Sequence, residues 1–485
     1  MELTQEIRDK YQPVIGLEVH AQMLTKTKAY SNDINEYGAA PNTNVSAISL
    51  GHPGTLPRMN KQTINYAIKM GLAIGSEIAE YQSFDRKNYF YPDLPKGYQI
   101  TQDITPICTG GEVVIKDAEG NEKGIRITRI HMEEDAGKSI HDIDPFNTLI
   151  DLNRAGVPLI EIVSEPDIAT SQEAYDYLTE IRKLVRYLDI CDGNMEEGSL
   201  RCDANISVML KGAKEYGQRV EVKNMNSIRN VQRAIEHEIE RHIIAIEKGE
   251  KIAQETRNYN ALTNETTAMR SKEAANDYRF FPEPDLQPIR VTQDHIDKVK
   301  EGMPPLPNYL FKRYTNELKL SEYDAGILTD QKEIALYFEE VIKTTSNYKS
   351  AANWVMGDMK SYLNAQAIPV SEFQITPEQL GELVNLIDEG KVSHNLASQK
   401  IFPAMLENPG NPEKIAADND WLQSNDGNEI EGFLDEVIAE NPAEVERFKN
   451  GEKKLMGFLM GQLMKKSRGK ADPKMATQLI NKKLG

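Results

Sequence analysis

Apolar and polar residues alternate in short runs over most of the first 225 residues, which predicts strands separated by turns. In the first run, Ile15, Leu17 and Val19 point to one face of a strand, whereas Glu18 and His20 point to the other. An acid and an imidazole on one strand face can hold a cation or steer a proton. The same pair also suits a half-buried edge strand on which both are solvated. This stretch alone leaves the two interpretations open.

A second alternating run covers residues 200–208, and residues 220–223 repeat its pattern. The apolar positions of both runs face a core, so the polar positions are expected to line the wall of a cleft. These polar residues are Arg201, Asp203, Asn205, Ser207, Glu221 and Lys223.

Three adjacent carboxylates, Glu133, Glu134 and Asp135, repel one another unless they are solvated or bind a cation. Strand alternation places Glu133 on the face of His131, but a bulge or turn near Gly137 would reverse the faces. The sequence therefore does not choose between the two glutamates as cation ligands.

A fourth acid, Glu161, lies inside the apolar strand expected over 158–167. Burying it without a partner is costly, so it should contribute to an ion pair or share a metal. Residues 150–152 and this strand are predicted to form a hairpin around the turn 153–156.

Helical spacing of apolar residues appears at 61–74, at 171–188 and in a segment that begins near Ser227. From about residue 296 to 405 the pattern is helical throughout, with a capping box at Thr376–Gln379.

Cations alternate with aromatic residues at 84–93, where Arg86 and Lys87 precede a Pro turn, and again near 277–286. Cations neutralise phosphates and rings stack on bases, so these runs suit a nucleotide or RNA. A tyrosine-rich strand with a solvated Arg and Lys explains them equally well.

The length of 485 residues allows roughly three domains. The net charge of −18 argues against a uniform coat of nucleic acid but not against a local basic patch. No basic leader with an apolar run and no stretch of 18 apolar residues is visible, so we expect neither a signal peptide nor a membrane partner. The three cysteines form no disulfide framework and favour a reducing, cytoplasmic location.

The last 80 residues separate their charges. Residues 406–446 contain twelve acids and one base, whereas residues 447–485 contain eleven bases and two acids, which gives −11 and +9. The basic segment is either a solvated helix face or a surface for a polyanion.

Six motifs in this order resemble the B subunits of the tRNA-dependent amidotransferases, which convert Glu-tRNA(Gln) or Asp-tRNA(Asn) to the amide. The resemblance covers essentially the whole chain. It implies an α+β protein: a catalytic cradle with a large, mainly antiparallel sheet at 1–293, of the glutamine synthetase and guanidino kinase type, an all-α connector at 294–405 and a helical tRNA-binding tail at 406–485. The motifs are Val14–His20, Phe84–Asp93, His131–Lys138, Leu159–Asp167, Met195–Asn205 and Tyr278–Leu286.

The resemblance also implies ATP as a substrate and Mg²⁺ as the metal, held by Glu18, His20, Glu134 or Glu133, and Glu161. Lys87 is then a candidate catalytic cation. Residues expected to contact the nucleotide or the substrate are Arg86, Lys87, Arg201, Asp203, Asn205 and Lys223. Cations expected to contact tRNA are Lys465, Lys466, Arg468 and Lys470.

No Gly/Ser-rich amidase signature is visible, so the ammonia should come from a partner amidase (glutaminase) subunit, with a small third subunit completing the complex around a misacylated tRNA. Some family members hold zinc through two cysteine pairs near residues 29–50. Ser31, Asp33, Ser46 and Ser49 occupy those places here, so we expect no zinc. Two rival interpretations are a metal-dependent phosphoesterase that uses the same acids and a tRNA-binding scaffold without catalysis.

Overall fold

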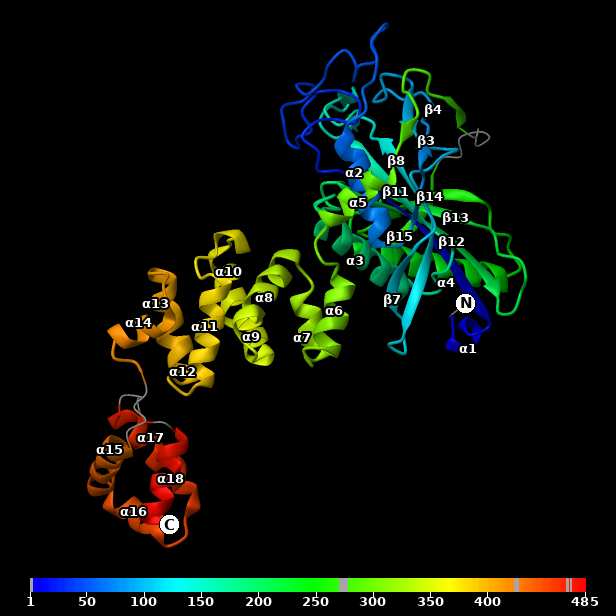
Figure 1. Ribbon diagram of the computed structural model, residues 1–485. Coiled ribbons are helices and arrows are strands. Elements are labelled where there is room, and N and C mark those ends of the chain that lie inside the picture. The colour runs from blue at the N-terminus through cyan, green and yellow to red at the C-terminus, as the bar shows by residue number, and fades with distance from the viewer. Residues whose placement is uncertain (1–2, 270–277, 423–426, 468–470, 472) are drawn as a thin grey trace. The chain divides into compact units, whose positions relative to one another are not determined.

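One large sheet forms the centre of the N-terminal part of the chain in this computed structural model, which describes residues 3–269, 278–422, 427–467, 471 and 473–485 (Figure 1). The strand order is β15-β14-β13-β12-β1-β11-β8-β6-β2, and β7 also pairs with β8. Every pairing is antiparallel except that of β13 with β14, which confirms the predicted mainly antiparallel sheet. The strands are β1 (Tyr11–Gln22), β2 (Glu77–Ile78), β6 (Cys108–Thr109), β7 (Glu112–Lys116), β8 (Glu122–Glu134), β11 (Pro158–Ser164), β12 (Leu200–Leu210), β13 (Val220–Lys223), β14 (Glu255–Asn260) and β15 (Glu265–Ala268).

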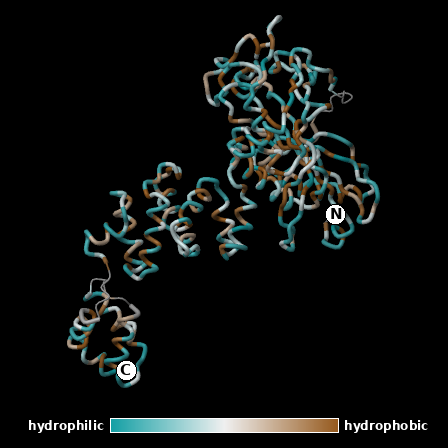
Figure 2. Tube along the Cα trace, viewed as in Figure 1, coloured by the Kyte–Doolittle hydropathy of each residue, from teal (hydrophilic) through white to brown (hydrophobic). Residues whose placement is uncertain are grey.

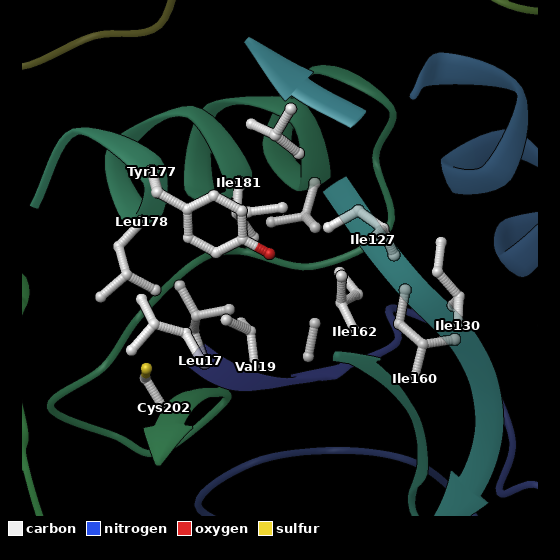
Figure 3. Close-up of a cluster of buried hydrophobic side chains, with 14 of the residues drawn as sticks. Leu17, Val19, Ile127, Ile130, Ile160, Ile162, Tyr177, Leu178, Ile181 and Cys202 are labelled. Carbon is white, nitrogen blue, oxygen red and sulfur yellow. The ribbon is translucent and has the colours of Figure 1, made fainter. Parts of the chain in front are cut away.

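One face of this sheet is apolar and packs against helices (Figure 3). Leu17 and Val19 of β1 lie opposite Ala204 and Cys202 of β12, so the alternation in the two strands buries both sets on the same side. Helix α3 (Ser171–Tyr187) covers them, and α4 (Ile228–Glu247) packs beside α3 and on β12. Hydrophobic positions accordingly gather in the middle of this unit (Figure 2). The other face is left to the polar residues.

The helix predictions for this part are confirmed. Helix α2 spans Lys61–Ala73 and α3 spans Ser171–Tyr187, while α4 begins directly after its cap, Ser227. The side chains of Asn60, Thr170 and Ser227 cap these helices by accepting hydrogen bonds from backbone N–H groups of the first turn. Helices α1 (Gln5–Arg8) and α5 (Gln293–Glu301) complete the N-terminal unit.

A small sheet brings the two runs of cations and aromatic residues together. Its order is β16-β4-β5, with β16 at Arg279–Pro282, β4 at Asp85–Asn88 and β5 at Tyr98–Thr101. Lys87 lies opposite Phe280 across the β16–β4 pair. Strands β3 (Tyr81–Gln82) and β17 (Ile289–Arg290) form a further two-stranded pair.

The predicted hairpin at 150–167 is wrong. Strand β10 (Leu149–Asp151) pairs with β9 (Lys138–Ile140), and β11 pairs with β1 and β8. The turn 153–156 is real, but a buried strand gains more from two neighbours in the large sheet than from one short partner.

The chain divides into two compact units, Met1–Leu306 and Pro307–Gly485. The second is helical, and its predicted capping box at Thr376 and Gln379 is confirmed. Helices α15, α17 and α18 of this unit share a small core of their own around Leu434, Leu459 and Ile480. Its α-helices are α6 (Pro307–Asn316), α7 (Glu322–Leu328), α8 (Lys332–Thr344), α9 (Tyr348–Trp354), α10 (Lys360–Gln366), α11 (Pro377–Asp388), α12 (His394–Leu396), α13 (Phe402–Glu407), α14 (Pro412–Asp418), α15 (Gly427–Glu440), α16 (Pro442–Lys449), α17 (Met456–Lys466) and α18 (Pro473–Leu484).

The predicted α+β class with helices after the sheet is confirmed, whereas the finer division at residues 293 and 405 stays a prediction. Within the described residues, no helix combines the length and the apolar character needed to cross a membrane.

Candidate active site

Four charged or titratable side chains form a row across the polar face of the large sheet. Strand register places Arg201 of β12 opposite His20 of β1, His20 opposite Glu161 of β11, and Glu161 opposite His131 of β8. The Glu161 Oε2 atom lies 3.2 Å from His20 Nε2 and 3.3 Å from His131 Nε2. The costly buried acid predicted at position 161 therefore has two imidazole partners.

Contacts within this row shift the pKa values of Glu161 and His20 towards their charged forms. Burial raises the pKa of Glu161, but hydrogen bonds from His131 and His20 outweigh burial and bring that pKa well below its usual range. Burial alone would lower the pKa of His20. The contact with Glu161 outweighs burial, so the pKa of His20 is raised. Glu161 is consequently an anion held between two imidazole rings.

Glu133 joins this group from the end of β8. Ligand atoms of His20, Glu133 and Glu161 all lie within 4.8 Å of one another. Lys87 Nζ is 3.2 Å from Glu133 Oε1 and 5.0 Å from the centre of the Tyr278 ring. Burial lowers the pKa of Lys87, but Glu133 and Glu161 outweigh burial and raise it. The small sheet thus delivers a cation to the edge of the acid group.

A second group of acids lies beside the first. Ligand atoms of Glu18, Asp203 and Glu221 also lie within 4.8 Å of one another. Lys223 Nζ contacts Asp203 Oδ2 at 2.5 Å and Glu221 Oε1 at 2.9 Å, while the amide of Asn205 donates to Glu18 Oε1 at 2.8 Å. Burial raises the pKa of Glu18, and repulsion from Glu161 adds to the rise. Burial and the neighbouring Glu161 thus both favour the protonated form of Glu18.

Two predicted site residues point elsewhere. Glu134, next to Glu133 in sequence, pairs with Lys96 and accepts a hydrogen bond from the Ile100 backbone N–H at 2.9 Å. Arg86 donates two hydrogen bonds to Glu283, at 2.8 and 2.9 Å, and its guanidinium lies over the Tyr98 ring. Both side chains are thus engaged by other residues of the chain. Of the two adjacent glutamates, Glu133 is the one that lies with His20 and Glu161.

The donor set fits a hard divalent cation. Carboxylate oxygens are the ligands that Mg²⁺ and Mn²⁺ prefer, and the two groups offer Glu133 and Glu161 in one and Glu18, Asp203 and Glu221 in the other. Burial is the main cause of the raised pKa of Glu18 and repulsion from Glu161 adds to it, so a cation beside Glu18 would favour its ionised form.

The site also contains three residues that were noted in the sequence but given no individual role there, namely His131, Asp135 and Glu221. Glu221 and His131 had the correct strand parity, but parity alone gave no reason to prefer them. Asp135 follows the last residue of β8 and accepts hydrogen bonds from Arg201, at 2.8 Å, and Gln22, at 2.7 Å. Only the pairing of β1, β8 and β12 reveals these contacts.

The predicted tRNA-binding cations lie in the other unit. Lys466, at the end of α17, pairs with Glu436 at 2.9 Å and Glu440 at 2.6 Å on α15. Lys465 is exposed and has no ion pair with the residues that the structure describes. The other two predicted cations, Arg468 and Lys470, lie outside the described residues.

The sequence matches a family described as the GatB/GatE catalytic domain over residues 13–297 and one described as the GatB domain over residues 336–484. Several similar proteins are named as the B subunit of an aspartyl/glutamyl-tRNA(Asn/Gln) amidotransferase. The protein of Gloeothece citriformis is 50% identical over 488 residues, which cover 99% of this chain and 98% of the relative. The protein of Trichodesmium erythraeum is 48% identical over 493 residues and all of both chains, and that of Alkalilimnicola ehrlichii is 49% identical over 476 residues, 98% of this chain and 99% of the relative.

Proposed function

The chain belongs to the family of aspartyl/glutamyl-tRNA(Asn/Gln) amidotransferase B subunits, and from this premise we propose that its N-terminal unit uses ATP to activate a carboxylate carried by tRNA. The carboxylate is the side chain of the glutamate in Glu-tRNA(Gln), of the aspartate in Asp-tRNA(Asn), or of both. The observation that supports this function best is the meeting of His20, Glu133 and Glu161 with Lys87 on one polar sheet face.

The reaction needs such a face because a carboxylate is a poor electrophile. Ammonia cannot expel an oxide, so one carboxylate oxygen must first become a leaving group. It does so by attacking the γ-phosphorus of ATP, which releases ADP and leaves an acyl phosphate. Ammonia then attacks the carbonyl carbon, and inorganic phosphate departs. The product is the amide, so the complex acts as a ligase that forms a carbon–nitrogen bond with glutamine as donor.

Phosphoryl transfer depends mostly on positioning and on neutralising charge. A Mg²⁺ ion held by His20, Glu133 and Glu161, with Glu18 beside them, would supply charge neutralisation for the phosphates. The chain's own cations act from two sides. Lys87 reaches the group from β4, and Arg201 lies in the row next to His20, so both offset repulsion between the phosphate and the substrate carboxylate.

The second acid group, Glu18, Asp203 and Glu221, and its partners are assigned to binding the nucleotide or the substrate. Lys223 contacts Asp203 and Glu221, and Asn205 donates to Glu18, so this corner places one ammonium group and one amide on the polar face. We assign Asp203, Asn205 and Lys223 to nucleotide or substrate binding. Arg86 and Glu134 support the site through Glu283 and Lys96.

A protein of this family works in a complex, and we assign the ammonia supply to an amidase subunit that hydrolyses glutamine, with a small third subunit and the misacylated tRNA as further partners. The helical tail is assigned to tRNA, with Lys465, Lys466, Arg468 and Lys470 as its candidate contacts. The reducing environment favoured by three free cysteines agrees with cytoplasmic protein synthesis.

One experiment separates this function from its rivals. The complex reconstituted with its partners is given misacylated tRNA, ATP, Mg²⁺ and glutamine, and the amino acid recovered from the tRNA is identified. Conversion to the amide that requires ATP and is lost in Glu161→Gln supports the proposal. Phosphate release or RNA cleavage without glutamine would indicate a phosphoesterase. Binding of tRNA without ATP turnover would indicate a scaffold.

A further inference from the structure

Asp135 is a buried carboxylate directly beside the row on the polar face. Its Oδ2 atom accepts hydrogen bonds from Arg201 Nη2 at 2.8 Å and from Gln22 Nε2 at 2.7 Å, and Arg154 Nε lies 3.7 Å away. The other oxygen accepts from the Ala136 backbone N–H at 3.0 Å. One side chain therefore ties together residues of β1, β12 and the loop after β10.

The segment around Asp135 is held in place without that carboxylate. The Asp135 backbone N–H donates to Val157 O at 2.8 Å, and the Gly156 N–H donates to Asp135 O at 2.9 Å. Arg154 donates to the Ala136 and Gly137 carbonyls at 3.0 and 2.7 Å. The main chain is thus fixed by backbone carbonyls, and the Asp135 side chain is left to serve other groups.

The Arg201 guanidinium has N–H donors that lack hydrogen-bond acceptors among the described residues. A guanidinium has five N–H donors, and the described residues supply it with one acceptor, Asp135. Its Nε atom is buried and has no hydrogen-bond partner there. A buried donor without an acceptor is costly, and the Arg201 side chain is 37% exposed, so an anionic oxygen could approach its remaining donors on the polar face. Because Arg201 lies opposite His20 in the strand register, such an oxygen would lie beside the proposed metal ligands.

We propose that Asp135 is a positioning residue that holds the Arg201 guanidinium by one edge, so that its remaining N–H donors bind an oxygen of the phosphoryl group being transferred. This inference rests on the proposed carboxylate activation. Without the Asp135 carboxylate, Arg201 has Asp203 and Glu133 as competing anions, and pairing with either would turn the guanidinium away from the phosphate.

Two cations surround the Asp135 carboxylate, because Arg201 Nη2 and Arg154 Nε lie 2.8 and 3.7 Å from its Oδ2 atom. A carboxylate that stays ionised can hold a guanidinium in a fixed orientation, which a neutral amide of the same size holds less firmly.

The test is a double-mutant cycle in the reconstituted complex, with formation of the acyl phosphate measured as ADP release in the absence of glutamine. We expect Arg201→Lys to lower kcat by about a hundredfold and Asp135→Asn by about tenfold, with KM for ATP changing less. If Asp135 acts through Arg201, the double variant loses no more than Arg201→Lys alone. Losses that multiply, or normal turnover in Asp135→Asn, would overturn the inference.

A matched control is Asp167→Asn, because Asp167 accepts two hydrogen bonds from the side chain of an arginine, Arg126, at 2.7 and 2.8 Å, yet lies outside the site. It should leave kcat unchanged. A wild-type complex without ADP release would contradict the proposed function itself, whereas an active wild type with multiplying losses contradicts only the role of Asp135.

Chemical rescue keeps the inference testable if Asp135→Asn does not fold. Arg201→Ala leaves the Asp135 carboxylate in place, so added guanidinium chloride at millimolar, non-denaturing concentration should restore part of its kcat. Methylammonium, which lacks the planar donor edge, should restore less. Where Asp135→Asn folds, the Asp135→Asn/Arg201→Ala double variant should not respond to guanidinium. Equal rescue by the two cations, or no rescue, would argue that Asp135 does not orient a guanidinium.

Discussion

Charged residues serve opposite purposes in the polar sheet face and in the helical tail. On the sheet face, Glu133 and Glu161 are 3% and 12% exposed, and each is within reach of several other titratable groups. In the tail, Glu436 and Glu440 are 59% and 58% exposed and meet one lysine, Lys466. Burial makes each contact in the sheet consequential, because an unpaired charge there costs on the order of several kcal/mol. Water screens the pairs in the tail, where they contribute little to stability.

The two regions differ in how firmly the fold fixes their charged side chains. A strand pair fixes side chains on one face at short, repeated spacing, so β12, β1, β11 and β8 bring their charges into a single row. The exposed helices α15 and α17 bring opposite charges together as well, but their water-exposed pairs can open and exchange partners. Such pairs suit a reversible contact with a polyanion rather than catalysis.

The largest effect is expected for substitutions of the candidate metal ligands in the row and in the acid group beside it. His20→Ala or Glu18→Ala should lower carboxylate phosphorylation by about a thousandfold or more, because each removes a ligand candidate from a site where charge must be neutralised. ADP release by the reconstituted complex measures this, and the urea midpoint of the variant checks that it remains folded. His141→Ala, an exposed histidine on a loop, is the control. Turnover close to that of the wild type in a folded variant would refute the assignment.

The second effect measures what burial of a charge costs in the N-terminal unit. Lys28 is fully buried, and its Nζ donates to Asn44 O at 2.7 Å. Burial outweighs attraction by Asp33 and Glu134 and lowers the pKa of Lys28 from 10.5 to about 8. Between these values the unfolded chain holds the proton and the folded chain does not, so stability rises with pH. Below about pH 8 the penalty is present in full.

Lys28→Met should therefore stabilise the unit by about 2 kcal/mol near pH 7, and this gain should shrink as the pH approaches 10.5. The three cysteines are buried in this unit, so pulsed thiol labelling along a urea titration follows its unfolding. Lys26→Met, at an exposed position, is the control. A variant less stable than the wild type at pH 7 would show that the hydrogen bond to Asn44 outweighs the cost of burial.

Some of the contacts in the candidate site could be predicted from the sequence, and others could not. Alternation predicted that Glu18 and His20 share a face and that Arg201, Asp203 and Lys223 face a cleft, because side-chain direction in a strand is local. It also placed Glu133 on the same face as His131, and the unbroken register of β8 with β11 over these residues agrees with this. Which strands are neighbours is not local, so the contacts of Glu161 with two histidines and of Asp135 with Arg201 emerge only in the fold. The wrong hairpin at 150–167 has the same origin.

The third effect concerns the tail. Because α14 packs on α11, removal of residues 427–485 takes away the small core with its basic segment and leaves the preceding helices intact. KM for aminoacyl-tRNA should rise roughly tenfold at physiological salt, and its salt dependence should flatten, since fewer phosphate contacts release fewer counterions. The kcat at saturating tRNA should fall less. Steady-state kinetics at several salt concentrations measure this, and an unchanged KM would assign the tail another role.

Single charge reversals refine the tail prediction. Lys466→Glu leaves a glutamate beside Glu436 and Glu440, whereas Lys465→Glu acts on an exposed cation. If tRNA uses exposed charge, Lys465→Gln should weaken tRNA binding at low salt more than Lys466→Gln, because Lys466 is already partly neutralised. Equal affinity for the wild type and Lys465→Glu would show that this end of α17 does not touch tRNA.

The smallest expected effect is that of a chelator on the loop that contains Asp33. In this loop a carboxylate is held by hydroxyl groups instead of by cations. Asp33 Oδ2 accepts hydrogen bonds from the Ser46 N–H and hydroxyl, both at 3.0 Å, and from Ser49, while Ser31 lies 3.4 Å from Ser49. Burial raises the pKa of Asp33, but the serine hydrogen bonds outweigh burial and lower it, so the loop is held by an ionised carboxylate among hydroxyl groups. These oxygen atoms replace the thiolates that a closed structural zinc prefers.

Purified protein should therefore contain much less than one zinc per chain by elemental analysis, and a chelator should not move its unfolding midpoint. Asp33→Asn should destabilise the loop with or without the chelator, whereas one tightly held zinc per chain would contradict this account.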